Sequence, residues 1–221
     1  MAQETPYEKY LHADKILSYQ KKESELVVEG ERDFQGVQQE AEFIWARIIP
    51  ILRKANDALE KDTIEDATHL LERGAALWSE LTAKNEELLW RLWPGDFLKI
   101  RKVLGAGGST ADSPRFHESE TIARGLWTPF EQVLLKRSVS LKALFKGEAG
   151  DSGLRFLTKA MMMYDYRVQE FNLSHLYLVF GEIGDKTMGL KGGTTDYLIR
   201  RYGQYLFPKL WDTVNEIYTD Q

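Results

Sequence analysis

Apolar side chains recur every three or four residues along most of this chain. Between positions 34 and 59 they form one continuous stripe: Phe34, Val37, Ala41, Ile44, Ile48, Ile51, Ala55 and Leu59. This spacing places them on one side of an α-helix, which repeats every 3.6 residues. Pro50 interrupts the stripe and predicts a kink or a break, because proline lacks the N–H that a helix interior uses.

The same spacing predicts further helices elsewhere. We expect them over residues 63–92, from Asp96 as a cap to 103, from about 129 to 136, onward to 145, over 153–183 and over 196–218. No stretch alternates every second residue for long enough to predict a sheet. The sequence therefore predicts an all-α helical bundle, with residues 1–221 forming one domain, because a chain of this length can bury one sizeable core.

Three glycine-rich stretches separate these helices, over 104–114, 147–153 and 189–196. The first is open to two interpretations, a linker between two domains or a functional loop. We favour the functional loop, because neither half of the chain has apolar residues that would obviously form a complete hydrophobic core of its own.

Composition excludes several classes of protein. The net charge of -5 disfavours nucleic acid as a partner, and the absence of cysteine removes disulfides, thiolate chemistry and cysteine-based zinc sites. The first residues lack the apolar core of a signal peptide, and no apolar run approaches the ~20 residues of a membrane span. We therefore expect a soluble, cytoplasmic protein without a membrane partner.

Four histidines limit the metal chemistry: His12, His69, His117 and His175. None forms a zinc-binding pair on a helix, and only His175 shares a helical face with apolar residues, among them Phe171 and Leu178. Such an imidazole is either a satisfied core histidine or an axial ligand of haem iron. Residue pattern alone leaves both readings open.

The segment 175–184, followed by Gly192, Gly193 and Tyr197, resembles the haem-ligand helix of tryptophan 2,3-dioxygenases, where an Ile-Gly pair ends nine residues after the proximal histidine. Three more segments resemble the same family in the same order. They are Tyr7-x-x-Tyr10-Leu11-x-x-Asp14-Lys15-Ile16-Leu17, Phe34-x-x-Val37-Gln38-Gln39-x-x-Glu42 and Pro94-x-x-Phe97-x-x-x-Arg101-x-x-Leu104-Gly105.

This resemblance implies a non-covalent haem b with His175 as the proximal iron ligand, and a divergent haem-dependent aromatic oxygenase. Arg101 would clamp a substrate carboxylate, and Gly108, Ser109 and Phe171 would adjoin the haem or its bound oxygen. The aromatic pocket would be lined by Phe34, Phe97, Tyr7, Tyr10 and Leu11. The last three would come from an N-terminal helix, within residues 1–20, that reaches a neighbouring subunit of a homo-oligomer, either a tetramer or a dimer.

Two positions depart from the family pattern. Gln38 stands where the family has a distal histidine, so it can donate or accept a hydrogen bond but cannot act as a base. Lys191 stands in the glycine-rich loop where the family has threonine, and it suits a substrate carboxylate or a haem propionate.

The expected reaction is cleavage of L-tryptophan, or of a related indole, by dioxygen. The alternatives are a haem monooxygenase or hydroxylase of a tyrosine- or tryptophan-derived substrate in secondary metabolism, a non-catalytic sensor of haem or an aromatic ligand, and a helical interaction module without haem.

Overall fold

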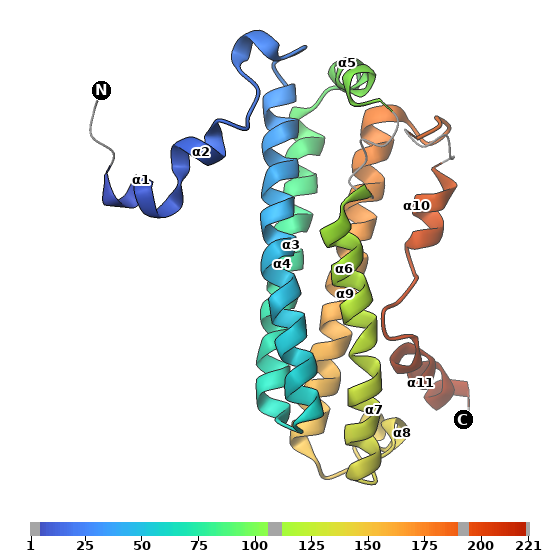
Figure 1. The fold of residues 1–221 in the computed structure, drawn as a ribbon. Coiled ribbons are helices and arrows are strands. Elements are labelled where there is room, and N and C mark those ends of the chain that lie inside the picture. The colour runs from blue at the N-terminus through green and yellow to red at the C-terminus, as the bar shows by residue number, and fades with distance from the viewer. Residues whose placement is uncertain (1–4, 106–111, 190–194, 220–221) are drawn as a thin grey trace.

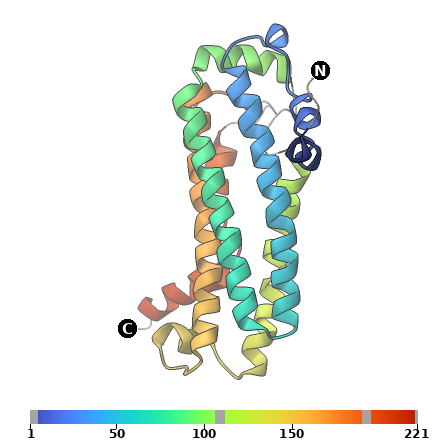
Figure 2. The ribbon, with the colours of Figure 1, turned by 90° about the vertical axis from the view of Figure 1, so that its left-hand side faces the viewer.

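The structure is a computed structural model that describes residues 5–105, 112–189 and 195–219. The regular elements in these ranges are all helices, as the apolar spacing predicts. Four long stems run side by side (Figures 1 and 2). The stems are α3 (Glu31–Glu60), α4 (Ile64–Arg91), α6 (Pro114–Gly125) with α7 (Trp127–Lys136), and α9 (Ser152–Ile183).

Shorter helices surround the four stems. The helix α5 (Pro94–Leu104) crosses one end of the bundle, and α8 (Leu141–Lys146) lies at the other end (Figure 1). The helices α10 (Asp196–Arg201) and α11 (Pro208–Thr219) follow α9 on its outer side (Figure 1). None of the described helices combines the length and the apolar character that crossing a bilayer requires.

The N-terminal segment extends to one side of the bundle (Figure 1). It contains α1 (Pro6–Leu11), α2 (Ala13–Leu17) and a short 3-10 helix, Glu23–Glu25. Thr5 caps α1 in a reciprocal arrangement with Glu8, and neither α1 nor α2 buries any side chain. Helices of this length gain little stability by themselves, because most helical stability in proteins comes from packing.

The centre of the core lies where α4 meets α9. Trp78 donates its indole N–H to the hydroxyl of Tyr164 at 2.8 Å, and both side chains are fully buried. Gly74 allows this approach, because a Cβ added there would lie 2.8 Å from Cε2 of the Tyr164 ring. The glycine is therefore required for packing and not for a turn.

Gly74→Ala should lower the free energy of unfolding by about 1–3 kcal/mol, since the buried Tyr164 ring has no room to move away. Gly36→Ala is the matched control, because it also lies inside a long helix but meets nothing within 4 Å. That variant should gain about 0.5–1 kcal/mol from its helix propensity. Urea denaturation of both variants measures the difference, and equal shifts in both would contradict the packing role.

The helices differ from the expected ones at several points. Helix α3 passes through Pro50 without a break. Pro50 is exposed, as is Ala46 four residues earlier, so water can satisfy the carbonyl that proline leaves without a donor. Helix α5 begins at Pro94, two residues before the expected Asp96 cap, with Trp93 in the cap position. A helix, α6, follows Ser113, which accepts a hydrogen bond from the Phe116 N–H as its cap.

The expected final helix is two helices, α10 and α11. Between them, the backbone N–H groups of Leu206 and Phe207 donate to the carboxylate of Asp165 at 3.0 and 3.1 Å, and the indole N–H of Trp211 donates to the same carboxylate at 2.9 Å. Asp165 is fully buried on α9. Its carboxylate therefore replaces the helical hydrogen bonds that the chain gives up at this point.

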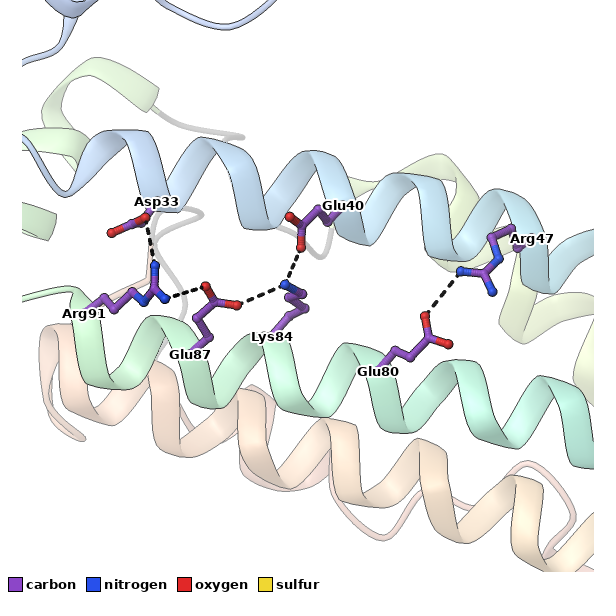
Figure 3. A network of polar contacts seen from close by, with 7 residues as sticks. All are labelled: Asp33, Glu40, Arg47, Glu80, Lys84, Glu87 and Arg91. Carbon is purple, nitrogen blue, oxygen red and sulfur yellow. Dashed lines mark hydrogen bonds and ion pairs between the residues drawn. The ribbon is translucent and has the colours of Figure 1, made fainter. Parts of the chain in front are cut away.

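Charged side chains join α3 to α4 along their solvent side (Figure 3). Lys84 pairs with Glu40 and Glu87, and Arg91 pairs with Asp33 and again with Glu87. One further pair, Arg47 with Glu80 at 3.2 Å, lies farther along the same two helices. Because each cation meets a partner on the opposite helix, the ladder favours one register of α3 against α4, although each exposed pair contributes little stability.

Candidate functional site

A cavity of about 410 Å³ lies between α3 and α5 at one end of the bundle. This volume is within the range of small-molecule sites, about 300–1,000 Å³. Its polar lining comes mainly from one side of α3: Lys21, Glu31, Gln35, Gln38, Gln39 and Glu42, with Ser113 from the cap of α6. Its apolar lining is Phe34, Trp45, Ile100, Val103 and Leu104.

The charged residues of this lining are paired. Glu31 accepts hydrogen bonds from the Lys21 ammonium and, at 2.7 Å, from the Val27 N–H. Burial would raise the pKa of Glu31, but these two hydrogen bonds, together with the positive charges of Lys21 and Arg32, hold the pKa below its usual range. Glu42 pairs with Arg115 of α6 at 3.0 Å. The cavity wall therefore carries charges that are already neutralised within the protein.

His175 lies on α9, outside the lining of this cavity. Its ring stacks on Phe171, with centroids 6.1 Å apart and planes 9° from parallel. Phe171 meets Trp45 edge to face at 6.4 Å, so two aromatic rings connect the histidine to the cavity wall. Phe171 thus supports His175 from within the apolar core.

The imidazole of His175 is neutral near pH 7. Burial, together with the positive charge of Arg201, lowers its pKa to about 4. Among the described residues, its ring nitrogens have no hydrogen-bond partner. Arg201, from α10, pairs with Glu120 and lies 4.5 Å from the ring centroid of Phe116. A neutral imidazole next to a buried guanidinium is therefore held at this end of the bundle.

These residues fit a haem in their donor chemistry. A porphyrin supplies four nitrogens, so haem iron needs as little as one protein ligand, and a neutral imidazole on an apolar helix is such a ligand. The absence of any described cluster of three His, Cys, Asp or Glu side chains that could hold a metal ion is compatible with this. Arg201, whose charge acts on His175, is already paired with Glu120. The described cavity, however, does not extend to His175.

The other expected site residues lie in different parts of the structure. Phe34 and Gln38 line the cavity, and Phe97 lies behind Phe34 with ring centroids 5.8 Å apart. Arg101 is not part of the lining and donates to the backbone carbonyl of Met188, so its guanidinium holds the segment after α9. Its expected role as a carboxylate clamp stays a prediction.

The N-terminal residues Tyr7, Tyr10 and Leu11 are not part of the cavity lining of the same chain. The side chains of Tyr7 and Tyr10 are 71% and 84% exposed, and Leu11 is also exposed. They contribute nothing to the pocket of their own subunit, which is compatible with the expected contact to a neighbour. Gly108, Ser109 and Lys191 lie outside the described residues.

Glu182 is a buried titratable residue that sequence reasoning missed. It lies seven residues after His175 and hence on the same face of α9, and its Oε1 atom is buried without a hydrogen-bond partner. Burial raises the pKa of this carboxyl to about 8. The seven-residue spacing was visible in the sequence, but the burial was not.

The raised pKa makes stability depend on pH in one direction. The folded state keeps the proton of Glu182 up to about pH 8, whereas the unfolded chain releases it near 4.5. Stability is therefore highest below pH 4.5, as far as this group is concerned, and is lost as the pH rises toward 8. Glu182→Gln should remove this loss and stabilise the protein at pH 7 by on the order of 2 kcal/mol.

Urea denaturation at pH 5 and pH 7 measures the effect of Glu182→Gln. Glu86→Gln serves as the control, because Glu86 lies exposed on α4. An unchanged difference between the two pH values in Glu182→Gln would contradict the burial of this carboxyl.

No protein-family model matches this chain, and no curated protein matches it either. Function is therefore inferred from the residues and their geometry.

Proposed function

We propose that this protein is a haem-dependent oxygenase of small aromatic substrates, with His175 as the proximal iron ligand. The observation that carries the proposal is the imidazole itself. It is neutral, it has no described hydrogen-bond partner, and Phe171 supports it from the core. A haem b bound there would supply the activation of dioxygen.

The described residues would bind and orient the substrate. Phe34 and Trp45 offer aromatic walls to a planar ring, and Gln38 offers an amide that can donate or accept a hydrogen bond. The walls of the cavity would also exclude water from one side of the ring. Positioning is thus the main contribution that we assign to these side chains.

The resemblance to tryptophan 2,3-dioxygenases favours cleavage of L-tryptophan or a related indole. Hydroxylation of a tyrosine- or tryptophan-derived substrate is the second candidate, and the presence of Gln38 in the cavity favours it. A glutamine cannot remove a proton from an indole N–H, so a reaction that needs a base at this position would not proceed here.

The absorption spectrum of the protein, as purified and after addition of haem, tests the proposal. We expect a Soret band at one haem per chain. Indoles and phenols are then supplied with dioxygen and a reductant, and mass spectrometry shows whether the product gains two oxygen atoms or one. A protein that binds no haem contradicts the proposal. Haem binding without turnover of any substrate indicates a sensor.

We propose in addition that the chain forms a homo-oligomer through its N-terminal helices. Tyr7, Tyr10, Leu11 and Leu17 expose apolar surface on α1 and α2. These helices bury nothing within their own chain, so a neighbouring subunit would supply the missing packing. If α1 and α2 contact the pocket of a neighbouring subunit, their side chains would belong to that subunit's site.

Deletion of residues 1–17 should reduce both the oligomeric mass and the turnover, because the exposed apolar side chains are removed together. Sedimentation analysis at micromolar concentration measures the first effect, and product formation measures the second. The matched control replaces Lys9 and Lys15 with alanine, which leaves the apolar residues in place. Two results would refute the role of the N-terminal helices. One is a deletion variant that is monomeric and fully active, and the other is a deletion variant whose oligomer is unchanged.

A further inference from the structure

The outward side of α9 carries a stripe of large apolar side chains that remain exposed. Phe156, Met163, Tyr166 and Tyr177 are between 44% and 68% exposed, and Leu173 lies half-buried among them. A helix that is apolar all round is normally buried on all sides, whereas α9 buries mainly the side that faces α4. Exposed apolar surface that extends along a whole helix indicates an interaction site.

The stripe has the spacing of a coiled-coil seam. Its members are Phe156, Lys159, Met163, Tyr166, Glu170, Leu173 and Tyr177. Steps of three and four residues alternate through this set, which is the 3.5-residue repeat that two helices use to pack along each other. From its first to its last member the stripe is about 32 Å long, since an α-helix rises 1.5 Å per residue. The stripe is therefore suited to a second helix of similar length.

Two members of the stripe are charged. Lys159 is exposed and forms no ion pair with any residue that the structure describes. Glu170 pairs with Arg167 of its own helix at 2.6 Å, and its other oxygen accepts from the Tyr166 hydroxyl at 2.6 Å. Such exposed pairs contribute little, so the carboxylate remains available to a second cation. Polar residues in a seam of this kind select the register and the orientation of the partner helix.

The two charges favour an antiparallel copy of the same helix. In a parallel pair, Lys159 would face Lys159 and Glu170 would face Glu170, and like charges that meet in an interface are costly. In an antiparallel pair, a twofold axis between positions 164 and 165 places Lys159 opposite Glu170 of the partner subunit.

The same axis also matches the apolar members of the stripe. It places Met163 opposite Tyr166 of the partner subunit and Phe156 opposite Leu173 of the partner subunit. One register thus pairs the charges and the apolar side chains together. The stripe is therefore complementary to itself, as an isologous interface requires.

We infer that α9 packs antiparallel against α9 of a second copy of this chain, through an interface separate from the N-terminal helices. If the N-terminal helices also associate, the two twofold contacts together build a tetramer from two dimers. The inference goes beyond the proposed function and does not rest on haem binding.

Lys159→Glu tests the contact in the full chain, because it places like charges opposite each other at two points of the twofold interface. We expect the dissociation constant of this contact to rise at least about tenfold. Sedimentation velocity over micromolar concentrations should then show half the wild-type mass. The starting assembly is a dimer, or a tetramer if the N-terminal helices also associate.

Two further variants serve as controls. Lys54→Glu makes the same charge change at an exposed position of α3 that forms no ion pair with a described residue, and it should leave the mass unchanged. The double variant Lys159→Glu with Glu170→Lys exchanges the two charges and should restore the wild-type mass. Thermal unfolding verifies that each variant remains folded.

Introduced cysteines report the orientation directly, because the chain contains none of its own. Met163→Cys and Tyr166→Cys are made in separate chains and mixed to allow exchange of subunits. In the antiparallel pair the two positions face each other, so mild oxidation of the mixture should give a disulfide-linked dimer, whereas each variant alone should give much less. Non-reducing electrophoresis measures the product.

Three results would overturn the inference. The first is a full chain that is monomeric throughout the concentration range, and the second is equal mass for Lys159→Glu and Lys54→Glu. The third is cross-linking of each cysteine variant with itself and not in the mixture, which would indicate a parallel pair. A protein that binds no haem but assembles as expected would refute the proposed oxygenase and leave this inference standing.

Discussion

Replacement of His175 with alanine should abolish stable haem binding and leave the helix content of the protein largely unchanged. The side chain is half-buried and makes no hydrogen bond to a described residue, so its removal costs the fold little. The loss of the one proposed iron ligand, in contrast, removes the bond that fixes the haem. The Soret band after addition of haem and gel filtration measures the first effect, and far-ultraviolet circular dichroism measures the second.

His69→Ala is the control for this experiment, because His69 lies exposed on α4 and pairs with Glu72. It should retain the spectrum of the wild-type protein. Added imidazole should restore part of the Soret band in His175→Ala, since the free ligand can occupy the space of the side chain. A His175→Ala protein with an unaltered haem spectrum would rule out this assignment.

Replacement of Asp165 with alanine should lower the free energy of unfolding by roughly 5 kcal/mol. Three N–H donors lose their acceptor together, and each buried donor left without a partner costs about 1–3 kcal/mol. Asp165→Asn should lose less, because one oxygen remains to accept while its NH2 group faces a donor. Urea denaturation measures both losses, and proteolysis should cut the segment before α11 sooner in Asp165→Ala.

Asp212→Ala is the control for Asp165, because Asp212 lies exposed on α11 itself. It should change stability by less than about 0.5 kcal/mol, as is usual for surface positions. If Asp165→Ala is no less stable than Asp212→Ala, the carboxylate does not anchor the C-terminal segment.

The apolar spacing predicted the long helices because burial of one face is a local property of the sequence. It missed α6, since residues 114–125 contain few apolar residues and the helix depends on Ser113 as its cap. It joined α10 and α11, because the break between them is stabilised by Asp165, 41 residues before Leu206 in the sequence. Contacts over such distances leave no periodic signal.

The candidate site, like the set of helices, could be predicted from the sequence only in part. Phe34 and Gln38 line the cavity and the guanidinium of Arg101 donates to the Met188 carbonyl, and the ligand contacts expected of all three residues stay predictions. Side-chain type indicates what a residue can bind, but not which partner it meets. The buried carboxyl of Glu182 and the unpaired N–H of Trp45 follow from tertiary packing, so only the structure reveals them.

The pairing of α4 with α9 also sets the order in which the protein opens. These two helices form the most extensive contact in the bundle, and Trp78 and Tyr164 lie at its centre. Their central amide protons should therefore exchange with deuterium only through global unfolding, while those of α1 and α2 should exchange within seconds in an isolated subunit. The protein then behaves as a slow-exchanging pair of helices, distant in sequence, to which the other segments attach with graded protection.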